Sequence, residues 1–271
     1  MFRQDATAIY AVTDFWEPFL KYLQSGRQDA WTLARADELQ RGKNVVDAAG
    51  QTLDTLQHFI FSSLPSGDQI SNHVLTKLHH HEGKADVVHY LKNSGSKRLA
   101  DITTVFWCGY YMENFARYDL NPYIRPRKDG SGDLYITTRA APSTPFGFLA
   151  TRKDVGLFVA SMLQRTPQGV YGPPVVADST TLTFEGVCEA LGKVVGRKIV
   201  YRQAALGEMG THYPVFGGEF DQLYELFNNY GFSGGQKTLG REELGLSKVT
   251  TSFETFVSEQ NWDGFVVESE K

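Results

Sequence analysis

Three short apolar runs alternate with helical patterns in the first hundred residues, and this alternation limits the fold more than any other feature. The runs are Ala8–Thr13, His58–Ser62 and Asp101–Trp107. Between them, apolar residues recur at helical spacing over Ala36–Ala49 and His79–Leu91. Strands that alternate with helices in this way form βαβ units, which build a parallel sheet with helices on its faces. We therefore predict an α/β fold around a parallel sheet.

The rest of the chain predicts a second group of elements. Residues 21–34 show no clear pattern, and residues 120–150 read as loops with one short hairpin. Further helices are expected at Arg152–Leu163, Thr181–Val195, Phe220–Tyr230 and Ser252–Gln260, and further strands at Val170–Ala177 and Lys198–Tyr201.

Charge and hydropathy exclude several classes of protein. The 27 Lys and Arg against 31 Asp and Glu give a formal net charge of −4, which provides no electrostatic footprint for direct nucleic-acid binding. No run approaches the roughly 18 apolar residues of a membrane helix. The only cysteines, Cys108 and Cys188, are too few for a disulfide framework. We expect a cytoplasmic protein without membrane contact, or a nuclear one if it acts as a regulator.

Polar residues follow the three predicted strands at the point where each strand ends. These are Thr13-Asp14-Phe15, Ser62-Ser63 and the stretch from Gly109 to Asn114. Ligands bind beyond the carboxyl ends of the strands in open parallel sheets, so these groups could line one crevice. The plainer interpretation is that strand ends are polar because loops begin there.

The helix at residues 79–91 carries the strongest candidate for chemistry. Lys84 lies four residues after His80, so the two side chains share a helix face. In dehydrogenases with a tyrosine in place of His80, such a lysine holds the nicotinamide ribose and the tyrosine passes a proton. Histidine titrates near neutrality and could serve as the acid. The alternatives are that Lys84 binds a dinucleotide while His80 is a spectator, or that both lie on a solvated face.

A metal site at the three consecutive histidines is not supported. Neighbouring helical residues point about 100° apart, so His79, His80 and His81 cannot converge on one ion. A two-histidine zinc helix needs its partners four residues apart, and none of the three has a histidine at that distance.

A glycine-rich phosphate loop is missing from this sequence. No Gly-x-Gly-x-x-Gly follows the first predicted strand, although this motif supplies the main pyrophosphate cradle of dinucleotide folds. Lys43, in Gln40-Arg41-Gly42-Lys43-Asn44, could approach a phosphate or ribose oxygen from a helix start, but such a lysine is usually solvated.

Several short segments in order resemble the NmrA-like family, atypical members of the short-chain dehydrogenase/reductase superfamily. The matching segments are Ala11–Glu17, Arg41–Ala49, Phe61–Leu64, His80–Lys84, Tyr111–Phe115 and Lys153–Gly156. The resemblance implies a Rossmann-like doubly wound parallel sheet with a small, mainly helical substrate domain. We assign residues 1–178 to the NAD(P)-binding part and residues 179–271 to the substrate side. The family's glycine-rich first strand has no counterpart here, so we expect an N-terminally truncated member or an incomplete gene model, with the Ala8–Thr13 strand at the sheet edge.

The resemblance also implies a cofactor, NADP or else NAD, and the residues that contact it. Thr13, Asp14 and Phe15 would lie along the dinucleotide, with Lys43 and Lys84 near its nicotinamide end. The wall beside it would consist of Tyr111, Met112, Glu113 and Asn114.

Three functions remain open at this point. The first is an NAD(P)-dependent oxidoreductase that uses His80 and Lys84 to tailor a small organic molecule in a fungal secondary-metabolite pathway. An aromatic lining would suit a ring-bearing substrate and would come from Tyr110, Tyr111, Phe115, Tyr224 and Phe227. The second is a redox sensor that binds NADP without turnover and contacts a protein partner, which the missing tyrosine favours. The third is a degenerate member that binds no dinucleotide.

Overall fold

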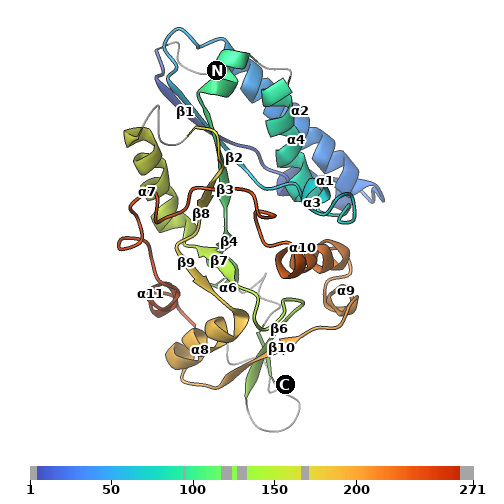
Figure 1. Ribbon diagram of the computed structural model, residues 1–271. Coiled ribbons are helices and arrows are strands. Elements are labelled where there is room, and N and C mark those ends of the chain that lie inside the picture. The colour runs from blue at the N-terminus through green and yellow to red at the C-terminus, as the bar shows by residue number, and fades with distance from the viewer. Residues whose placement is uncertain (1–4, 94–95, 117–123, 127–132, 166–170, 263–271) are drawn as a thin grey trace. The chain divides into compact units, whose positions relative to one another are not determined.

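The computed structural model describes residues 5–93, 96–116, 124–126, 133–165 and 171–262. The chain divides into two compact units. Figure 1 shows the elements of both, coloured along the chain from the N-terminus to the C-terminus. Unit 1 comprises residues 1–108, 159–176 and 233–244, and unit 2 comprises residues 109–158, 177–232 and 245–271. Within the described ranges, every helix is too short or too polar to span a bilayer.

Unit 1 is built on a parallel sheet, as the alternating pattern predicts. Strands β1 (Ala8–Val12), β2 (His58–Ser63), β3 (Thr103–Cys108) and β8 (Val175–Ala177) follow one another in the order β1-β2-β3-β8. The pairs β1–β2 and β2–β3 are parallel. Among the described strands β1 has one neighbour only, so it is an edge strand, and Val12 on it is 61% exposed.

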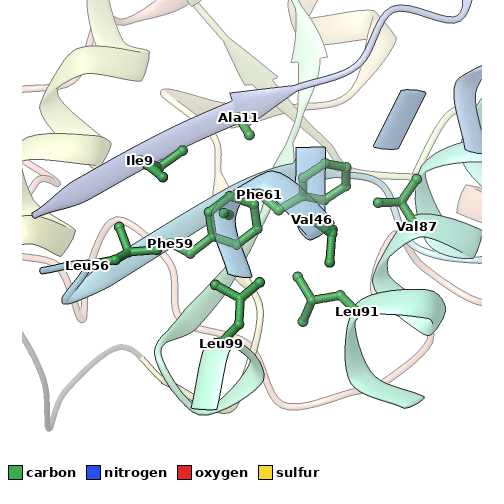
Figure 2. Packing of buried hydrophobic residues seen from close by; sticks show 10 residues of the cluster. Ile9, Ala11, Val46, Leu56, Phe59, Phe61, Val87, Leu91 and Leu99 are labelled. Carbon is green, nitrogen blue, oxygen red and sulfur yellow. The ribbon is translucent and has the colours of Figure 1, made fainter. Parts of the chain in front are cut away.

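The described helices that precede β3 accompany this sheet. They are α1 (Trp16–Gln24), α2 (Ala30–Gly50), α3 (Gly67–Ile70), α4 (His79–Asn93) and α5 (Lys97–Asp101). Figure 2 shows the hydrophobic core between these helices and the sheet. In it, side chains from β1 and β2 pack against side chains from α2, α4 and α5. Its buried members are Ile9, Ala11, Val46, Ala49, Leu56, Phe59, Phe61, Val87, Leu91 and Leu99. Alternate residues of β1 point into this core, which explains its every-other-residue burial.

Helices α2 and α4 approach each other closely at two consecutive turns. A side chain at Gly42 would overlap Val87, and one at Gly83 would overlap the carboxylate of Glu38. The contact positions advance by four residues on both helices, so the helices run parallel. Glycine is required at position 42 because a Cβ there would overlap the branched Val87 side chain, whereas a Cβ at position 83 would displace the Glu38 carboxylate.

We expect Gly42→Ala to lower the free energy of unfolding by about 1–3 kcal/mol, because the added methyl group overlaps Val87 in a packed interface. Chemical denaturation measures the change. Gly156→Ala is the matched control, since Gly156 is also helical but has open space where its Cβ would stand. That control should be neutral or more stable by up to about 1 kcal/mol. Equal effects of the two variants would contradict the close approach.

Unit 2 combines two three-stranded sheets with several short helices. One sheet has the order β10-β6-β5 and the other β4-β7-β9. The strands are β4 (Tyr110–Tyr111), β5 (Ile124–Pro126), β6 (Leu134–Thr138), β7 (Phe146–Leu149), β9 (Thr180–Leu182) and β10 (Ile199–Gln203). The helices are α6 (Glu113–Ala116), α8 (Phe184–Val195), α9 (Glu208–His212), α10 (Gly217–Asn229) and α11 (Phe253–Ser258), while α7 (Thr151–Gln164) runs across the boundary between the units.

Most predicted elements are confirmed, and the differences have local causes. Residues 21–34 are not structureless, because they contain the end of α1 and the start of α2. Residues 180–182 form β9, and α8 begins only after Thr183, whose hydroxyl accepts a hydrogen bond from the Gly186 amide. The predicted hairpin is the antiparallel pair β5–β6, but β7 in the same stretch joins the other sheet. Position 170 lies outside the described residues.

Candidate functional site

The side chain of Lys84 reaches from α4 to the carboxyl end of β1. Its Nζ donates to the backbone carbonyl of Thr13 at 2.6 Å and lies 3.4 Å from the Thr13 hydroxyl. The same ammonium forms an ion pair with Glu38 on α2. The Lys84 side chain is 14% exposed. Three segments distant in sequence therefore meet at one positive group on a partly exposed side chain.

Glu38 is the buried half of this pair. Its side chain is 0% exposed, and Oε1 accepts a 2.8 Å hydrogen bond from the hydroxyl of Thr13. Its second oxygen, Oε2, lies against the backbone at Gly83 and has no hydrogen-bond partner among the described residues. The carboxylate is thus enclosed by β1 and α4.

The second member of the predicted pair, His80, lies in an aromatic environment. Its ring centroid is 5.2 Å from Trp16 and 6.3 Å from Phe15. Burial, followed by the charge of Lys84, lowers the pKa of His80 to about 3. The imidazole is therefore neutral at physiological pH, and it holds no proton that it could release as a cationic acid.

The neighbours of His80 have structural contacts. The Nδ1 of His81 bonds to the Pro65 carbonyl at 2.9 Å, and burial holds the pKa of His81 well below its ordinary value. Glu82 accepts from the Ser66 hydroxyl at 2.8 Å and from the Asp68 amide at 3.0 Å, which ties α4 to α3. In the ranges that the structure describes, no three His, Cys, Asp or Glu side chains are grouped to hold a metal ion.

Asp14 and Phe15 are placed by contacts that support α1. The Asp14 carboxylate accepts from the amide of Trp16 at 2.8 Å and from the amide of Glu17 at 3.5 Å. It therefore occupies the end of the helix where a phosphate would otherwise bind. Phe15 is 1% exposed and packs against both Phe19 and Trp31, so its ring belongs to the packing of the unit.

Lys43 lies away from Lys84. It stands in the interior of α2 rather than at a helix start, and its Nζ lies 5.2 Å from the centroid of the Tyr90 ring. Tyr90 follows Lys84 by six residues, about 9 Å along α4. The structure thus brings Thr13 and Lys84 together and leaves Lys43 in a separate cation–π contact.

The four residues predicted to form a wall belong to unit 2. Tyr111 is 44% exposed, whereas Met112 is fully buried. The Glu113 carboxylate accepts a 3.1 Å hydrogen bond from the amide of Arg152 in the first turn of α7. Asn114 follows it in α6 and is partly buried.

The predicted aromatic lining is largely a packing core, so this expectation requires correction. Phe115 and Tyr224 are 0% exposed and Phe227 is 7% exposed. Phe227 stacks on Phe146 with centroids 4.2 Å apart, and Phe115 packs edge-on against Phe253 at 5.5 Å. Aromatic residues clustered in sequence are equally suited to a core, and here packing against other rings takes them out of solvent.

A cavity of about 270 Å³ lies in unit 1, beside β2 and β3. Helix α4 lines it with Ala85, Val88, His89 and Lys92, and neither His80 nor Lys84 is among its lining residues. Trp107 contributes from β3. The sequence alone does not indicate this cavity, because the cavity is formed by tertiary packing.

Glu38 is the main site residue that the sequence analysis did not identify, although a signal was present. The buried residues of α2 recur along one stripe at Ala30, Ala34, Glu38, Gly42, Val46 and Ala49. A carboxylate in the middle of an otherwise apolar stripe is expensive unless it is paired. That position therefore required a cation from a neighbouring element.

The NmrA-like family model matches residues 20–257, most of the chain. The chain belongs to the NmrA-like family. This confirms the resemblance drawn from the short segments. Two curated relatives are each 25% identical to it: an NmrA-like family domain-containing protein of Dictyostelium discoideum and the nitrogen metabolite repression protein nmrA of Emericella nidulans. The matched regions cover 83% and 68% of this chain, and 70% and 50% of the two relatives.

Solved structures of NmrA-like and reductase proteins share the fold. NmrA, a negative transcriptional regulator, in complex with NADP matches with a TM-score of 0.66 at 21% identity, over 94% of this chain and 74% of NmrA. The triphenylmethane reductase of Citrobacter sp., complexed with NADP(H), matches with a TM-score of 0.57 at 14% identity, over 94% of this chain and 77% of the reductase. The predicted α/β fold with a Rossmann-like parallel sheet is thus confirmed, and the relationship includes both regulators and reductases.

Proposed function

We propose that this NmrA-like protein binds NADP, or NAD, at Lys84 and acts as a redox sensor without turnover. The observation that carries the proposal is the Lys84 ammonium at the carboxyl end of β1, the edge at which parallel sheets bind ligands. The Lys84 side chain is 14% exposed, and a ribose or carbonyl oxygen would have to reach its ammonium from that part. The NADP complex of NmrA, a regulator of the same fold, supports the choice of cofactor.

The state of His80 favours sensing over catalysis. A proton donor works best when its pKa lies near the operating pH. The pKa of His80 is about 3 because the ring is buried, so the neutral imidazole is poorly matched to that task. The protein would then respond to the oxidation state of the bound nucleotide by a change in its binding to a protein partner, and not by turnover.

The residues fit one half of a dinucleotide better than the other. Lys84 and Thr13 suit the ribose and nicotinamide end, while Asp14 occupies the first amides of α1, where a pyrophosphate would otherwise bind. NADPH carries a hydride and NADP accepts one, and in a sensor without turnover the nucleotide would supply only its oxidation state as the signal. The residues of this chain would bind and orient the nucleotide.

An NAD(P)-dependent reductase that tailors a small organic molecule is the second candidate. The cavity of about 270 Å³ beside β2 and β3 favours it, since its volume is close to that of small-molecule pockets. In that case, turnover should persist in His80→Gln, because a neutral histidine with a pKa of about 3 is not the proton donor.

A thermal-shift titration with NADPH tests the proposed function. Ligand at about 100 times its dissociation constant should add roughly 2.7 kcal/mol of stability, which raises Tm by about 5–10 °C for a chain of this size. Lys84→Gln should reduce the shift, and Lys43→Gln is the control that should retain it. The absence of a shift with the unmodified protein at millimolar NADPH would count against both candidates and favour a member that binds no dinucleotide.

A further inference from the structure

We propose that Glu38 is a positioning residue that makes Lys84 a donor to a neutral ligand oxygen, a hydroxyl or carbonyl, and not a receptor for phosphate. The proposal deepens the proposed function and rests on it for the dinucleotide. It also makes a prediction about inorganic phosphate that needs no dinucleotide.

The charges within the site are balanced before any ligand arrives. Lys84 contributes one positive charge, and Glu38 contributes one negative charge in direct contact with it. Thr13 adds only neutral oxygens. A ligand that approaches the ammonium therefore meets an ion pair rather than a net cation. Such a pair can still donate a hydrogen bond, but its attraction for an anion is weak.

The contacts of the ammonium also define the direction in which it can donate. Its shortest bonds run inward, to the Thr13 carbonyl and to Glu38. The third contact, to the Thr13 hydroxyl, is long at 3.4 Å. An ammonium has three donors, so the one with the long contact is the most readily given to a ligand.

Glu38 cannot easily leave this position. The Thr13 hydroxyl donates to one carboxylate oxygen at 2.8 Å, and the backbone at Gly83 lies against the other. The side chain is fully buried between the elements that carry these groups. The compensating charge is therefore a permanent part of the site.

Stability alone is a poor explanation for this arrangement. A buried ion pair often contributes no more than apolar residues of the same volume. Here the cost is greater still, since Oε2 of Glu38 lacks a hydrogen-bond partner in the part of the chain that the structure describes. The buried carboxylate of Glu38 offsets the positive charge of Lys84, and an apolar residue at position 38 could not do so.

The test compares inorganic phosphate with chloride at equal ionic strength, about 0.15 M, so that general screening is the same. Two quantities are measured: Tm without nucleotide, and the Kd of NADPH. For the unmodified protein we expect both to be the same in the two salts. In Glu38→Gln the ammonium is uncovered, so phosphate should raise Tm and weaken NADPH binding about tenfold by competition.

Two further variants separate charge from shape. Glu38→Asp retains a carboxylate and should remain insensitive to phosphate. The double variant Glu38→Gln/Lys84→Gln removes the ammonium as well and should lose the phosphate response of the single variant. Asp37→Asn is the control on the same helix, since Asp37 accepts from Tyr22 and lies outside the site. It should behave as the unmodified protein.

The proposal is overturned if Glu38→Gln responds to phosphate no more than the unmodified protein does. It is also overturned if phosphate already competes at Lys84 in the unmodified protein, a result that needs no variant of Glu38 to fold. An unmodified protein that does not bind NADPH would contradict the proposed function instead. The effect of phosphate on Tm in Glu38→Gln would still decide the role of Glu38.

Discussion

Replacement of Lys84 by methionine is expected to lower the free energy of unfolding by about 3–5 kcal/mol at neutral pH. The reason is the partner that remains. Glu38 is 0% exposed, and without Lys84 its charge would be compensated only by the 2.8 Å hydrogen bond from the Thr13 hydroxyl. Urea denaturation followed by circular dichroism measures the loss.

A second substitution at Glu38 tests this explanation. The double variant Lys84→Met/Glu38→Met has no buried charge, so it should recover most of the lost stability. Lys43→Met is the control, because it removes an equally long lysine whose contact is the face of Tyr90 and should cost about 1 kcal/mol or less. A loss in Lys84→Met that the double variant fails to recover would show that the destabilisation does not come from the carboxylate.

Acid is expected to destabilise unit 1 well before its carboxylates are protonated. Burial lowers the pKa of His58 to about 4 and that of His80 to about 3, from an ordinary value of 6.5. The pKa of His81 is also lowered by burial. Below pH 6.5 the unfolded chain therefore binds protons that the folded chain does not. The free energy of unfolding decreases as the pH is lowered.

The size of this effect follows from the gap between the two pKa values. At pH 5, His58 and His80 should each reduce stability by on the order of 2 kcal/mol relative to pH 8, and His81 should act in the same direction. The combined loss would be a large part of the 5–15 kcal/mol that typically holds a domain folded. The loss should continue until the pH reaches the folded pKa values, near 4 for His58 and near 3 for His80.

Tm measured from pH 8 to pH 4 checks this expectation. His58→Gln should flatten the curve, because glutamine can still bond to the Thr104 hydroxyl that His58 contacts at 2.8 Å but cannot take up a proton. His89→Gln is the matched control, since His89 is exposed on α4. If the two variants gave the same pH dependence, buried histidines would not be the cause.

The parts of the fold that depend on local periodicity were predictable from the sequence. The strand at residues 8–13 and the helix at residues 79–91 each end within two residues of their observed limits. The spacing of Lys84 and His80 was also a sound guide to a shared helix face. The spacing does not predict the environment of the His80 side chain. Burial there lowers the pKa of His80 to about 3, far from neutrality.

The parts that depend on contacts between distant segments were not predictable in this way. The Glu38–Lys84 pair joins residues 46 positions apart. Its presence depends on how α2 and α4 cross. The ring of Phe115 was likewise expected beside a ligand, but it is buried against Phe253, which follows it by more than a hundred positions. A sequence shows that a residue is aromatic or charged, whereas tertiary packing decides which group it meets.

The two glycine contacts between α2 and α4 have a consequence for how this protein can change. Gly42 faces Val87 one turn after Gly83 faces Glu38, so the spacing that packs the helices also sets the reach from Glu38 to Lys84. A substitution at Gly42 that widens the interface should alter ligand affinity without touching the ligand. The effects of substitutions at Gly42 and Lys84 on ligand affinity should accordingly be non-additive. A change in the helix interface would then also be a change in the binding site.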